Sequence, residues 1–410
     1  MSVHWQRMRL KFIAPTVRKI LPSRPEGMRY IGLENIEAGT GKLLLNTEQE
    51  QVDSSVIAFD EHSVLFGKLR PYLAKVAMPD FDGVASTEIM VLEPTDGNER
   101  RFLAYSLLSD EFIKRVSSMT DGAKMPRANP DDVLNLRLCV PKAAEQHRIA
   151  DYLDEQTAKI DNLMNMRRRQ MALLKEQRAA LIQRAVTRGL NPNALMKESG
   201  LPWLGNIPAH WEVKRNKTIF REIDNRSVDG SEELLSVSHL TGVTPRAQKE
   251  EVNMFLAESN EGYKRVDIGD LAINTMWAWM GALGFSNYSG IVSPSYNVYR
   301  IRTEAVSTYY DLLFRSPNFT KEIIRHSTGV WESRLRLYPQ AFFEIRSPAP
   351  PLEEQREIVS YVEKTTGQTE RVLKLIVRQL NLLAEYRAAL IHECITGQRR
   401  IGADLSTESL

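Results

Sequence analysis

Two long stretches of the chain, residues 141–189 and 350–398, carry the clearest pattern of apolar and polar positions. In both, two positions in each run of seven residues tend to be apolar, three or four residues apart. This is the spacing of a coiled-coil seam. The seam positions are Ile149, Leu153, Ile160, Leu163, Leu174 and Leu181 in the first stretch and Ile358, Val362, Val372, Ile376, Leu383 and Leu390 in the second. We expect two long helices that pair antiparallel with each other, because neither can bury its apolar stripe alone.

The two stretches are copies of one another. A shift of 209 positions aligns them without a gap, and 17 of the 49 aligned residues are identical. Both copies begin with proline and end near a glycine, Gly189 or Gly397, as helices often do. The longest identical run is Arg-Ala-Ala-Leu-Ile, at Arg178–Ile182 and Arg387–Ile391. We expect its small alanines to let the two helix backbones approach closely.

The repeat continues outside the helices. "HWQRMRLK", beginning at His4, has a counterpart in "HWEVKRNK", beginning at His210, and the strand-like "FDGVASTEIMV" aligns with "YSGIVSPSYNV". These copies predict an α/β (α+β) fold in which two globular domains are separated by two long helices that pair as an antiparallel coiled coil, with a pseudo-twofold internal repeat. The expected segments are a globular domain 1–140, a helix 141–189, a linker 190–208, a globular domain 209–349, a helix 350–398 and a tail 399–410.

Composition places the chain among water-soluble proteins of more than one domain. It has 410 residues, of which 42% are hydrophobic and 26% charged. Its most apolar window, Met276–Phe285, is too short to cross a bilayer, and its first residues do not resemble a signal peptide. The two cysteines, Cys139 and Cys394, are too few and too far apart for a zinc site or a disulfide framework. We expect a cytoplasmic protein with no membrane partner.

A search for catalytic motifs argues against an enzyme. "AGTGKLLL", Ala38–Leu45, resembles a phosphate-binding loop, but Ile36 stands at its first glycine position and Leu43 at its Ser/Thr position. Asp80 and Glu88 lack the lysine that would complete a nuclease site. The seven histidines have no metal-ligand spacing. We expect no catalytic residue, no metal and no cofactor in this chain.

Several stretches together resemble the specificity subunit of type I restriction–modification systems. The family's Pro, Glu-Gln, Ile and Tyr signature occurs in both helical copies, in "VPKAAEQHRIADYL" and "APPLEEQREIVSYV". "GLPWLGNIPAHWEV", Gly200–Val213, resembles the start of the family's second target-recognition domain. "DGAKMPRANPDDVLNLRLCVP" and "TGVWESRLRLYPQAFFEIRSPAPP" resemble the closing segments of its two recognition domains. The first copy departs from this pattern, since it lacks Leu-Gly-Asn-Ile-Pro before its His-Trp.

The resemblance implies a DNA-recognition subunit that is not itself catalytic. Each recognition domain would bind one half of a split double-stranded DNA target, and the paired helices would dock two adenine methyltransferase subunits. Those subunits would hold S-adenosylmethionine, and a separate restriction and motor subunit would cut. We expect the two half-sites to lie about one helical turn apart, roughly 34 Å, on one face of the duplex.

Contacts with DNA need Lys and Arg for phosphates and forked polar groups for bases. The candidates are Lys68, Arg70, Lys124 and Arg127 in the first domain, Arg334 and Arg336 in the second, and Arg7 and Arg9 in the basic N-terminal stretch. An ordinary solvated surface is the competing interpretation, since the net charge is only +2. Trp277 and Trp279 could brace a DNA-facing loop or belong to the core.

Two other functions remain compatible with the sequence. One is a coiled-coil adaptor whose globular heads bind proteins, and the other is a self-sufficient DNA enzyme. The bases read, the length of the gap between the half-sites and the presence of a cutting subunit stay open, because they depend on loop geometry and on other chains.

Overall fold

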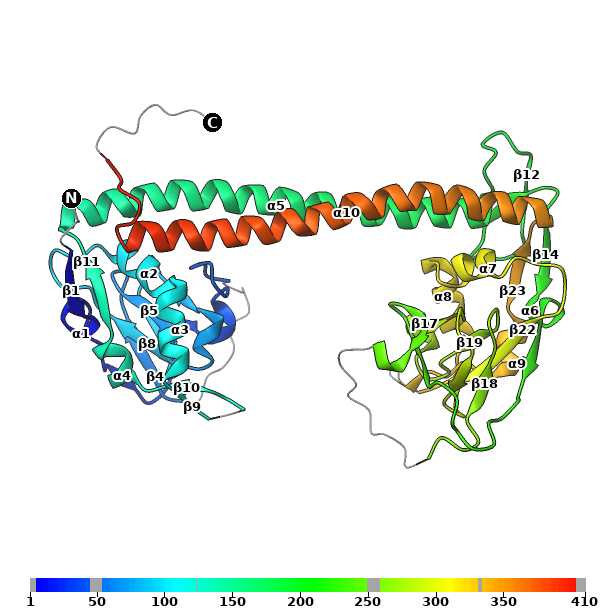
Figure 1. Ribbon diagram of the computed structural model, residues 1–410, viewed down its shortest axis with the longest axis horizontal. Helices are drawn as coiled ribbons and strands as arrows, with labels where there is room; N and C mark the ends of the chain where they lie inside the picture. Colours follow the sequence, from blue (N-terminus) through cyan, green and yellow to red (C-terminus); the bar gives the residue numbers. More distant parts are fainter. Residues whose placement is uncertain (1–4, 45–53, 123, 249–258, 331–333, 403–410) are drawn as a thin grey trace. The chain divides into compact units, whose positions relative to one another are not determined.

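The computed structural model describes residues 5–44, 54–122, 124–248, 259–330 and 334–402. The chain forms two compact units. Unit 1 comprises residues 1–168 and 377–410, and unit 2 comprises residues 169–376. Each unit holds a globular head and one part of each of two long helices, α5 (Ala143–Arg188) and α10 (Leu352–Ile395) (Figure 1).

Head 1, the part of unit 1 that precedes α5, combines short strands with short helices. Its strands form a four-stranded sheet in the order β2-β4-β7-β3, a three-stranded sheet in the order β6-β5-β8, and two further pairs, β1-β11 and β9-β10. The elements are β1 (Gln6–Arg9), α1 (Leu10–Ile13), β2 (Ile20–Leu21), β3 (Arg29–Ile31), η1 (Leu33–Asn35), β4 (Val56–Phe59), β5 (Val64–Gly67), η2 (Pro71–Leu73), β6 (Val76–Ala77), β7 (Gly83–Ser86), β8 (Ile89–Leu92), α2 (Arg100–Leu108), α3 (Asp110–Ser118), β9 (Thr120–Asp121), β10 (Arg127–Ala128), α4 (Pro130–Asn135) and β11 (Arg137–Val140).

Head 2, in unit 2, has a four-stranded sheet in the order β15-β22-β19-β20 and four two-stranded pairs, β12-β13, β14-β23, β16-β17 and β18-β21. Aromatic side chains of α7, α8 and α9 fill the core against the larger sheet. The elements are β12 (Met196–Glu198), β13 (Asn206–Pro208), β14 (Glu212–Arg215), α6 (Asn216–Ile219), β15 (Phe220–Ile223), β16 (Leu235–Ser238), β17 (Gly242–Pro245), η3 (Arg246–Gln248), β18 (Lys264–Val266), β19 (Leu271–Ile273), η4 (Ala278–Met280), β20 (Leu283–Phe285), β21 (Gly290–Val292), β22 (Asn297–Ile301), α7 (Ser307–Phe314), α8 (Pro317–His326), α9 (Pro339–Glu344) and β23 (Arg346–Ala349).

Each head is closed by a pair between its first and last strands. Gln6 of β1 lies opposite Val140 of β11, and Glu212 of β14 lies opposite Ala349 of β23. A long helix begins directly after the last strand in both cases. The pairing therefore holds the start of each head beside the point where its helix leaves.

The two long helices bury their apolar stripes inside each unit. In unit 1, one core contains the predicted seam residues Ile149, Leu153, Ile160, Leu383 and Leu390 together with residues of α2. In unit 2, Leu181, Ile358 and Val362 lie in the core that the helices share with head 2. Ile376 is buried and Leu174 half-buried, whereas Leu163 and Val372 are 36% and 39% exposed. The predicted fold, two globular domains with two paired long helices, is confirmed, although the seam is not buried along its whole length.

The repeated Arg-Ala-Ala-Leu-Ile run supplies an ion pair between the helices in each unit. In unit 1, Arg387 of α10 bonds to Asp161 of α5 at 3.2 Å, and in unit 2, Arg178 of α5 bonds to Glu370 of α10 at 2.7 Å. The shift of 209 positions converts one pair into the other. Residue numbers rise along α5 from Asp161 to Arg178, while those of their partners on α10 fall from Arg387 to Glu370. The helices therefore run antiparallel.

The alanines of this run do not form the contact. Ala179, Ala180 and Ala389 are exposed, and Ala388 is half-buried. The arginine joins the helices instead, because its long side chain reaches an acid on the opposite helix and presents several donors. Arg387 is 8% exposed and also donates to the carbonyl oxygens of Gly39 and Thr40, both at 3.0 Å, which ties head 1 to the helix pair.

Glycines follow both long helices, as predicted. Gly189 and Gly397 have φ values of 71° and 76°, a left-handed conformation that glycine adopts without strain. An indole lies against each of them within its unit. A Cβ atom on Gly189 would come within 3.3 Å of Trp211, and one on Gly397 within 3.2 Å of Trp5. Both the backbone angle and the close approach of a ring therefore require glycine at these helix ends.

The predicted linker, residues 190–208, is part of the packing of unit 2. It contains the hairpin of β12 and β13, and Leu204 and Ile207 are buried in the core of that unit. Trp203 packs edge-on against Phe319 of α8, with ring centroids 5.4 Å apart. The segment therefore packs against head 2 as a hairpin and is not a free connection between the units.

The Glu-Gln pair of each copy fastens a long helix to its head. Gln146 and Gln355 are buried, at 2% and 3% exposure. Gln146 accepts a hydrogen bond from the N–H of Glu99, which caps α2, and Gln355 accepts one from the N–H of Val306, which caps α7, both at 2.9 Å. Each glutamine also donates to the carbonyl oxygen of the proline five residues before it, at 3.0 and 2.9 Å.

Replacement of one of these glutamines should destabilise its unit. Gln146→Leu leaves a buried N–H and a buried carbonyl without partners, and we expect the free energy of unfolding to fall by roughly 2–4 kcal/mol. Urea denaturation followed by circular dichroism measures the change. Arg148→Ala, an exposed site on the same turn of α5, is the control and should change stability by less than about 0.5 kcal/mol. Equal losses in the two variants would contradict the assigned role.

Candidate nucleic-acid interface

Four of the predicted cations of head 1 gather where two segments meet. The segments are residues 67–75, which we call turn 1, and residues 120–128, which form the hairpin of β9 and β10 and which we call hairpin 1. The N–H of Ala128 donates to the carbonyl oxygen of Lys68 at 2.9 Å, and the N–H of Arg70 donates to that of Pro126 at 2.7 Å. These bonds bring together the cations Lys68, Arg70, Lys124 and Arg127.

Turn 1 holds two residues in a conformation that side chains disfavour. Arg70 has φ 50° and Ala74 has φ 47°, and they flank the short helix η2. The N–H of Gly67 donates to the carbonyl of Lys75 at 2.8 Å, and the N–H of Ala74 donates to that of Pro71 at 2.8 Å, so the turn is closed by its own backbone. Strained residues persist only where their surroundings determine them, and they cluster at functional sites.

The charges of this site are partly balanced by one acid. Arg127 forms an ion pair with Glu88, the residue that precedes β8. Burial lowers the pKa of Lys68, the nearby charge of Arg127 lowers it further, and the carboxylate of Glu88 acts in the opposite direction. Among the described residues, Arg70 and Lys124 are exposed and form no ion pair. The surface therefore presents more positive charge than Glu88 compensates, which suits a polyanion.

Head 2 contains a turn and a hairpin at the matching places, joined by one of these two bonds. Residues 274–282, turn 2, follow β19 and enclose η4. Residues 328–330 and 334–337, which we call hairpin 2, are joined by reciprocal bonds between Thr328 and Arg336 at 3.0 and 2.9 Å. The N–H of Leu337 donates to the carbonyl of Thr275 at 3.2 Å, as that of Ala128 does to Lys68 in head 1. The candidates Arg334 and Arg336 are both exposed on hairpin 2. The structure thus places both predicted cations of head 2 at the site that matches hairpin 1.

The two tryptophans of turn 2 lie differently from one another. Trp279 is half-buried and donates its indole N–H to the carbonyl of Met276 at 3.0 Å. Trp277 is 52% exposed, so the interpretation that it belongs to the core is wrong.

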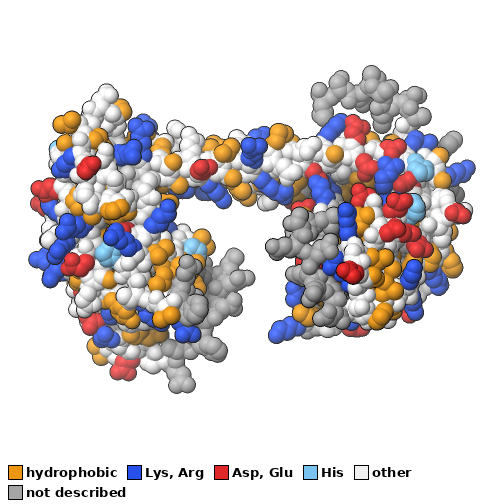
Figure 2. All heavy atoms as spheres, turned by 180° about the vertical axis from the view of Figure 1, so that it is seen from behind, with side chains coloured by type: hydrophobic (Ala, Val, Ile, Leu, Met, Phe, Trp, Pro, Cys, Tyr) orange, Lys and Arg blue, Asp and Glu red, His pale blue; other side chains and the backbone are white. Residues whose placement is uncertain are grey.

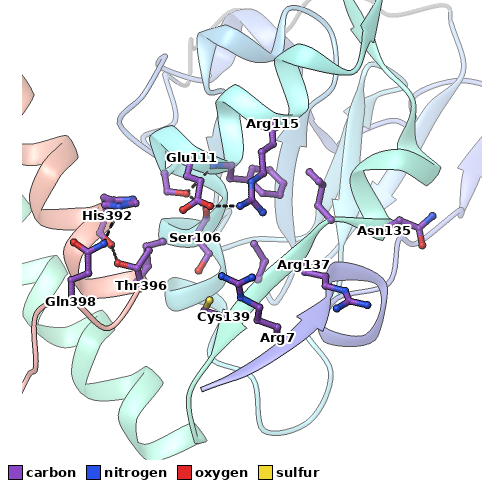
Figure 3. Close-up of a pocket in the computed structure, with 15 residues that line it drawn as sticks. Arg7, Ser106, Glu111, Arg115, Asn135, Arg137, Cys139, His392, Thr396 and Gln398 are labelled. Carbon is purple, nitrogen blue, oxygen red and sulfur yellow. Dashed lines mark hydrogen bonds and ion pairs between the residues drawn. The ribbon is translucent and has the colours of Figure 1, made fainter. Parts of the chain in front are cut away.

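Arg7 and Arg9 do not join this site. They lie on β1, which pairs with β11 on the side of head 1 next to the long helices, whereas β9 and β10 lie on the far side (Figure 1). Arg7 instead lines a cavity of roughly 570 Å³, together with Arg115, Arg137 and His392 (Figure 3). Arg115 pairs there with Glu111. Any anion contact of Arg7 is therefore separate from turn 1 and hairpin 1.

Comparison with known proteins finds similarity to one family in the first part of the chain. The family model described as "Type I restriction modification DNA specificity domain" matches residues 4–170. The specificity subunit of the type I restriction enzyme EcoDI from Escherichia coli is 24% identical over 163 residues, and that of MjaVIII from Methanocaldococcus jannaschii is 27% identical over 139 residues. Residues 4–170 are therefore similar to the DNA specificity domain of type I restriction–modification systems.

The sequence matches cover only part of those relatives. The EcoDI alignment spans 39% of this chain and 36% of the relative, and the MjaVIII alignment spans 33% and 30%. A solved structure described as "Structural basis underlying complex assembly and conformational transition of the type I R-M system" is 20% identical, has a TM-score of 0.70 and covers 95% of this chain and 97% of its own. At that identity the likeness shows the fold alone, over nearly the whole chain.

The described residues contain neither a membrane-spanning helix nor a cluster of metal-binding side chains. Within the described residues, no helix is both long and apolar enough to cross a bilayer. Nor do three or more His, Cys, Asp or Glu side chains of the described segments gather as a metal site would require.

Sequence reasoning missed two parts of this site. Glu88 was considered only as a nuclease residue, although it is the partner of Arg127. Trp277 was considered a brace or a core residue, although it corresponds to Arg70. The sequence itself contains the correspondence between Trp277 and Arg70. A shift of 207 positions aligns turn 1 with turn 2 and places Arg70 on Trp277 and Ala74 on Gly281.

Exchanging alanine and glycine at Ala74 and Gly281 should change the free energy of unfolding in opposite directions. Ala74 and Gly281 are both left-handed and both follow the short helix of their turn, with φ 47° and 85°. Because a left-handed alanine costs about 1–2 kcal/mol, we expect Ala74→Gly to raise the free energy of unfolding by about 0.5–1 kcal/mol, once the greater entropy of unfolded glycine is subtracted. Gly281→Ala should lower it by about 1 kcal/mol, since a Cβ there meets only Thr320 Oγ1 at 3.7 Å and the backbone angle alone is unfavourable. Urea denaturation of both variants measures this, and changes of the same sign would contradict the assigned strain.

Proposed function

We propose that this chain is a specificity subunit that binds a double-stranded DNA target made of two separated half-sites, one on each head. The proposal rests on one observation: a turn and a hairpin joined by an equivalent backbone bond occur in both heads, and both carry exposed cations. Lys and Arg at such a site neutralise phosphates, while side chains that differ between two copies of a scaffold supply different base contacts. Two similar surfaces with unlike side chains suit two unlike half-sites.

We further propose that the long helices dock two adenine methyltransferase subunits. Several large apolar side chains on α5 and α10 face solvent, and hydrophobic side chains are visible on the surface of the long helices (Figure 2). The most exposed of them are Met166, Leu173, Leu375, Leu382 and Tyr386. Apolar residues left outside an already paired seam favour a further helix partner, because they would be buried by it.

The chemistry belongs to those partners in this proposal. The methyltransferase subunits would bind S-adenosylmethionine, and the restriction and motor subunit would join the complex through them. The chain itself would contribute recognition and spacing and no catalytic residue. The relatives it matches support this division, since they are specificity subunits.

Loss of the cations of one hairpin should weaken DNA binding by the assembled complex. We expect Lys124→Ala combined with Arg127→Ala to reduce affinity roughly tenfold or more at moderate salt and to reduce the slope of log K against log salt by up to about 2. Fluorescence anisotropy with the complex of specificity and methyltransferase subunits measures both quantities. The double variant Lys114→Ala with Arg148→Ala removes two exposed cations of the same unit elsewhere and is the control. Unchanged DNA binding by the hairpin variant would favour the protein-binding adaptor.

Charges placed on the outer helix surface should separate the partners. Leu375 is 59% exposed, so Leu375→Glu should leave folding intact and lower the affinity for the methyltransferase subunit at least tenfold, because a carboxylate would be buried without a partner. Analytical ultracentrifugation of the two purified proteins measures assembly. Leu195→Glu, at a site that is 81% exposed on the segment before β12, is the matched control. Normal assembly of the Leu375 variant would contradict a binding site for the methyltransferase subunit on this helix surface.

A further inference from the structure

We propose that Arg70 and Trp277 occupy the same recognition position in the two heads and read DNA by different chemistry. Trp277 would contact the 5-methyl group of a thymine in one half-site, at the place where Arg70 would meet hydrogen-bond acceptors in the other. This inference rests on the proposed function and adds the base contact that head 2 makes.

The backbone shows that the two positions correspond. In turn 1, the N–H of Leu73 donates to the carbonyl of Arg70 at 2.9 Å, and in turn 2, that of Met280 donates to the carbonyl of Trp277 at 3.0 Å. The bond between Gly67 and Lys75 has its counterpart between the N–H of Asn274 and the carbonyl of Ala282, at 3.0 Å. Both Arg70 and Trp277 immediately precede the short helix of their turn. These bonds place the two residues at the same step of their turns, although the backbone differs there, with φ 50° at Arg70 and −122° at Trp277.

The side chain of Trp277 is not needed by the fold. It is 52% exposed, while its neighbour Ala278 is fully buried in the core of unit 2. Half an indole left in water at the edge of a turn is unfavourable for an isolated head, and exposed tryptophans are typical of binding surfaces. The position therefore has a use outside the head.

The surroundings of the two positions differ in kind. Around Trp277, turn 2 adds Met280, which is 39% exposed, and the residue after hairpin 2 adds Tyr338, which is 49% exposed. Turn 1 and hairpin 1 supply the cations Lys68, Lys124 and Arg127, and they also expose Tyr72 and Met125, at 54% and 62%. The difference lies in the turns: turn 2 has no cation and exposes Trp277 and Met280, whereas turn 1 has three cations beside the exposed Tyr72.

This difference selects different base edges. The guanidinium of an arginine pairs with the O6 and N7 acceptors of guanine, and an apolar side chain contacts the thymine methyl, which is the one apolar group on the major-groove edge of the bases. An indole has a flat apolar face and a single N–H, so it gains most from the methyl. Arg334 and Arg336 on hairpin 2 would meanwhile hold the phosphates of the same half-site.

Removal of the methyl group tests the proposal directly. Methylation mapping with the assembled wild-type complex first gives the two half-sites. Each thymine in them is then replaced by uracil, which lacks only the methyl, and affinity is measured by fluorescence anisotropy for the wild type, Trp277→Ala and Trp277→Phe. We expect one thymine, in one half-site only, to lower wild-type affinity three- to tenfold when replaced. Trp277→Ala should bind the two duplexes equally, whereas Trp277→Phe should keep most of the discrimination.

The control is Ile268→Ala, which removes an apolar side chain that is 70% exposed at the other end of β19 and should discriminate as the wild type does. Three results would overturn the inference: a wild-type complex indifferent to every such replacement, a half-site pair without thymine, or discrimination that persists in Trp277→Ala. A wild-type complex that binds no split target at all would instead refute the proposed function. Circular dichroism confirms that each variant is folded before its affinity is compared.

Discussion

The architecture depends on the fact that neither long helix can bury its apolar stripe alone. Each finds its partner in the other copy of the repeat, and the antiparallel register is fixed by two ion pairs, Arg387 with Asp161 and Arg178 with Glu370. Because the same 209-residue shift exchanges these pairs, each unit receives one long-helix start, one long-helix end and one head. The buried Gln146 and Gln355 then fasten each helix start to the N-terminus of α2 or α7, and an indole covers each helix end.

A head held in this way can change its recognition surface without changing its attachment. The strand pairs that close the heads, the glutamines and the tryptophan–glycine contacts all lie next to the long helices. Turn and hairpin are joined to each other by backbone bonds, so their side chains are free to differ. This separation explains why the helical copies resemble each other more closely than the heads do.

The exposed surface of the helices and that of the hairpins have different physical characters. On the helices, large apolar side chains remain outside a seam that is already paired, which favours docking of a protein. On hairpin 1, cations exceed the single acid that balances them, which favours a polyanion. A chain with a net charge of only +2 can therefore serve a nucleic acid locally, because its positive charge is gathered where it is needed.

The sequence alone determined the repeat, the two long helices, their antiparallel partnership and the glycines that follow them, because these depend on periodicity and on local backbone preference. It also located Lys68, Arg70, Lys124 and Arg127 as candidates, but as two separate basic stretches. Only the tertiary structure decided that these stretches meet, that Glu88 balances Arg127 and that Arg7 lies apart. It also decided that the arginine of the repeated run joins the helices, while three of the four alanines beside it are exposed. It likewise exposed Trp277, which in the sequence belongs to the most apolar window of the chain. Contacts between distant segments follow from how strands close a head and how a turn is bonded, and no local pattern of residue types specifies them.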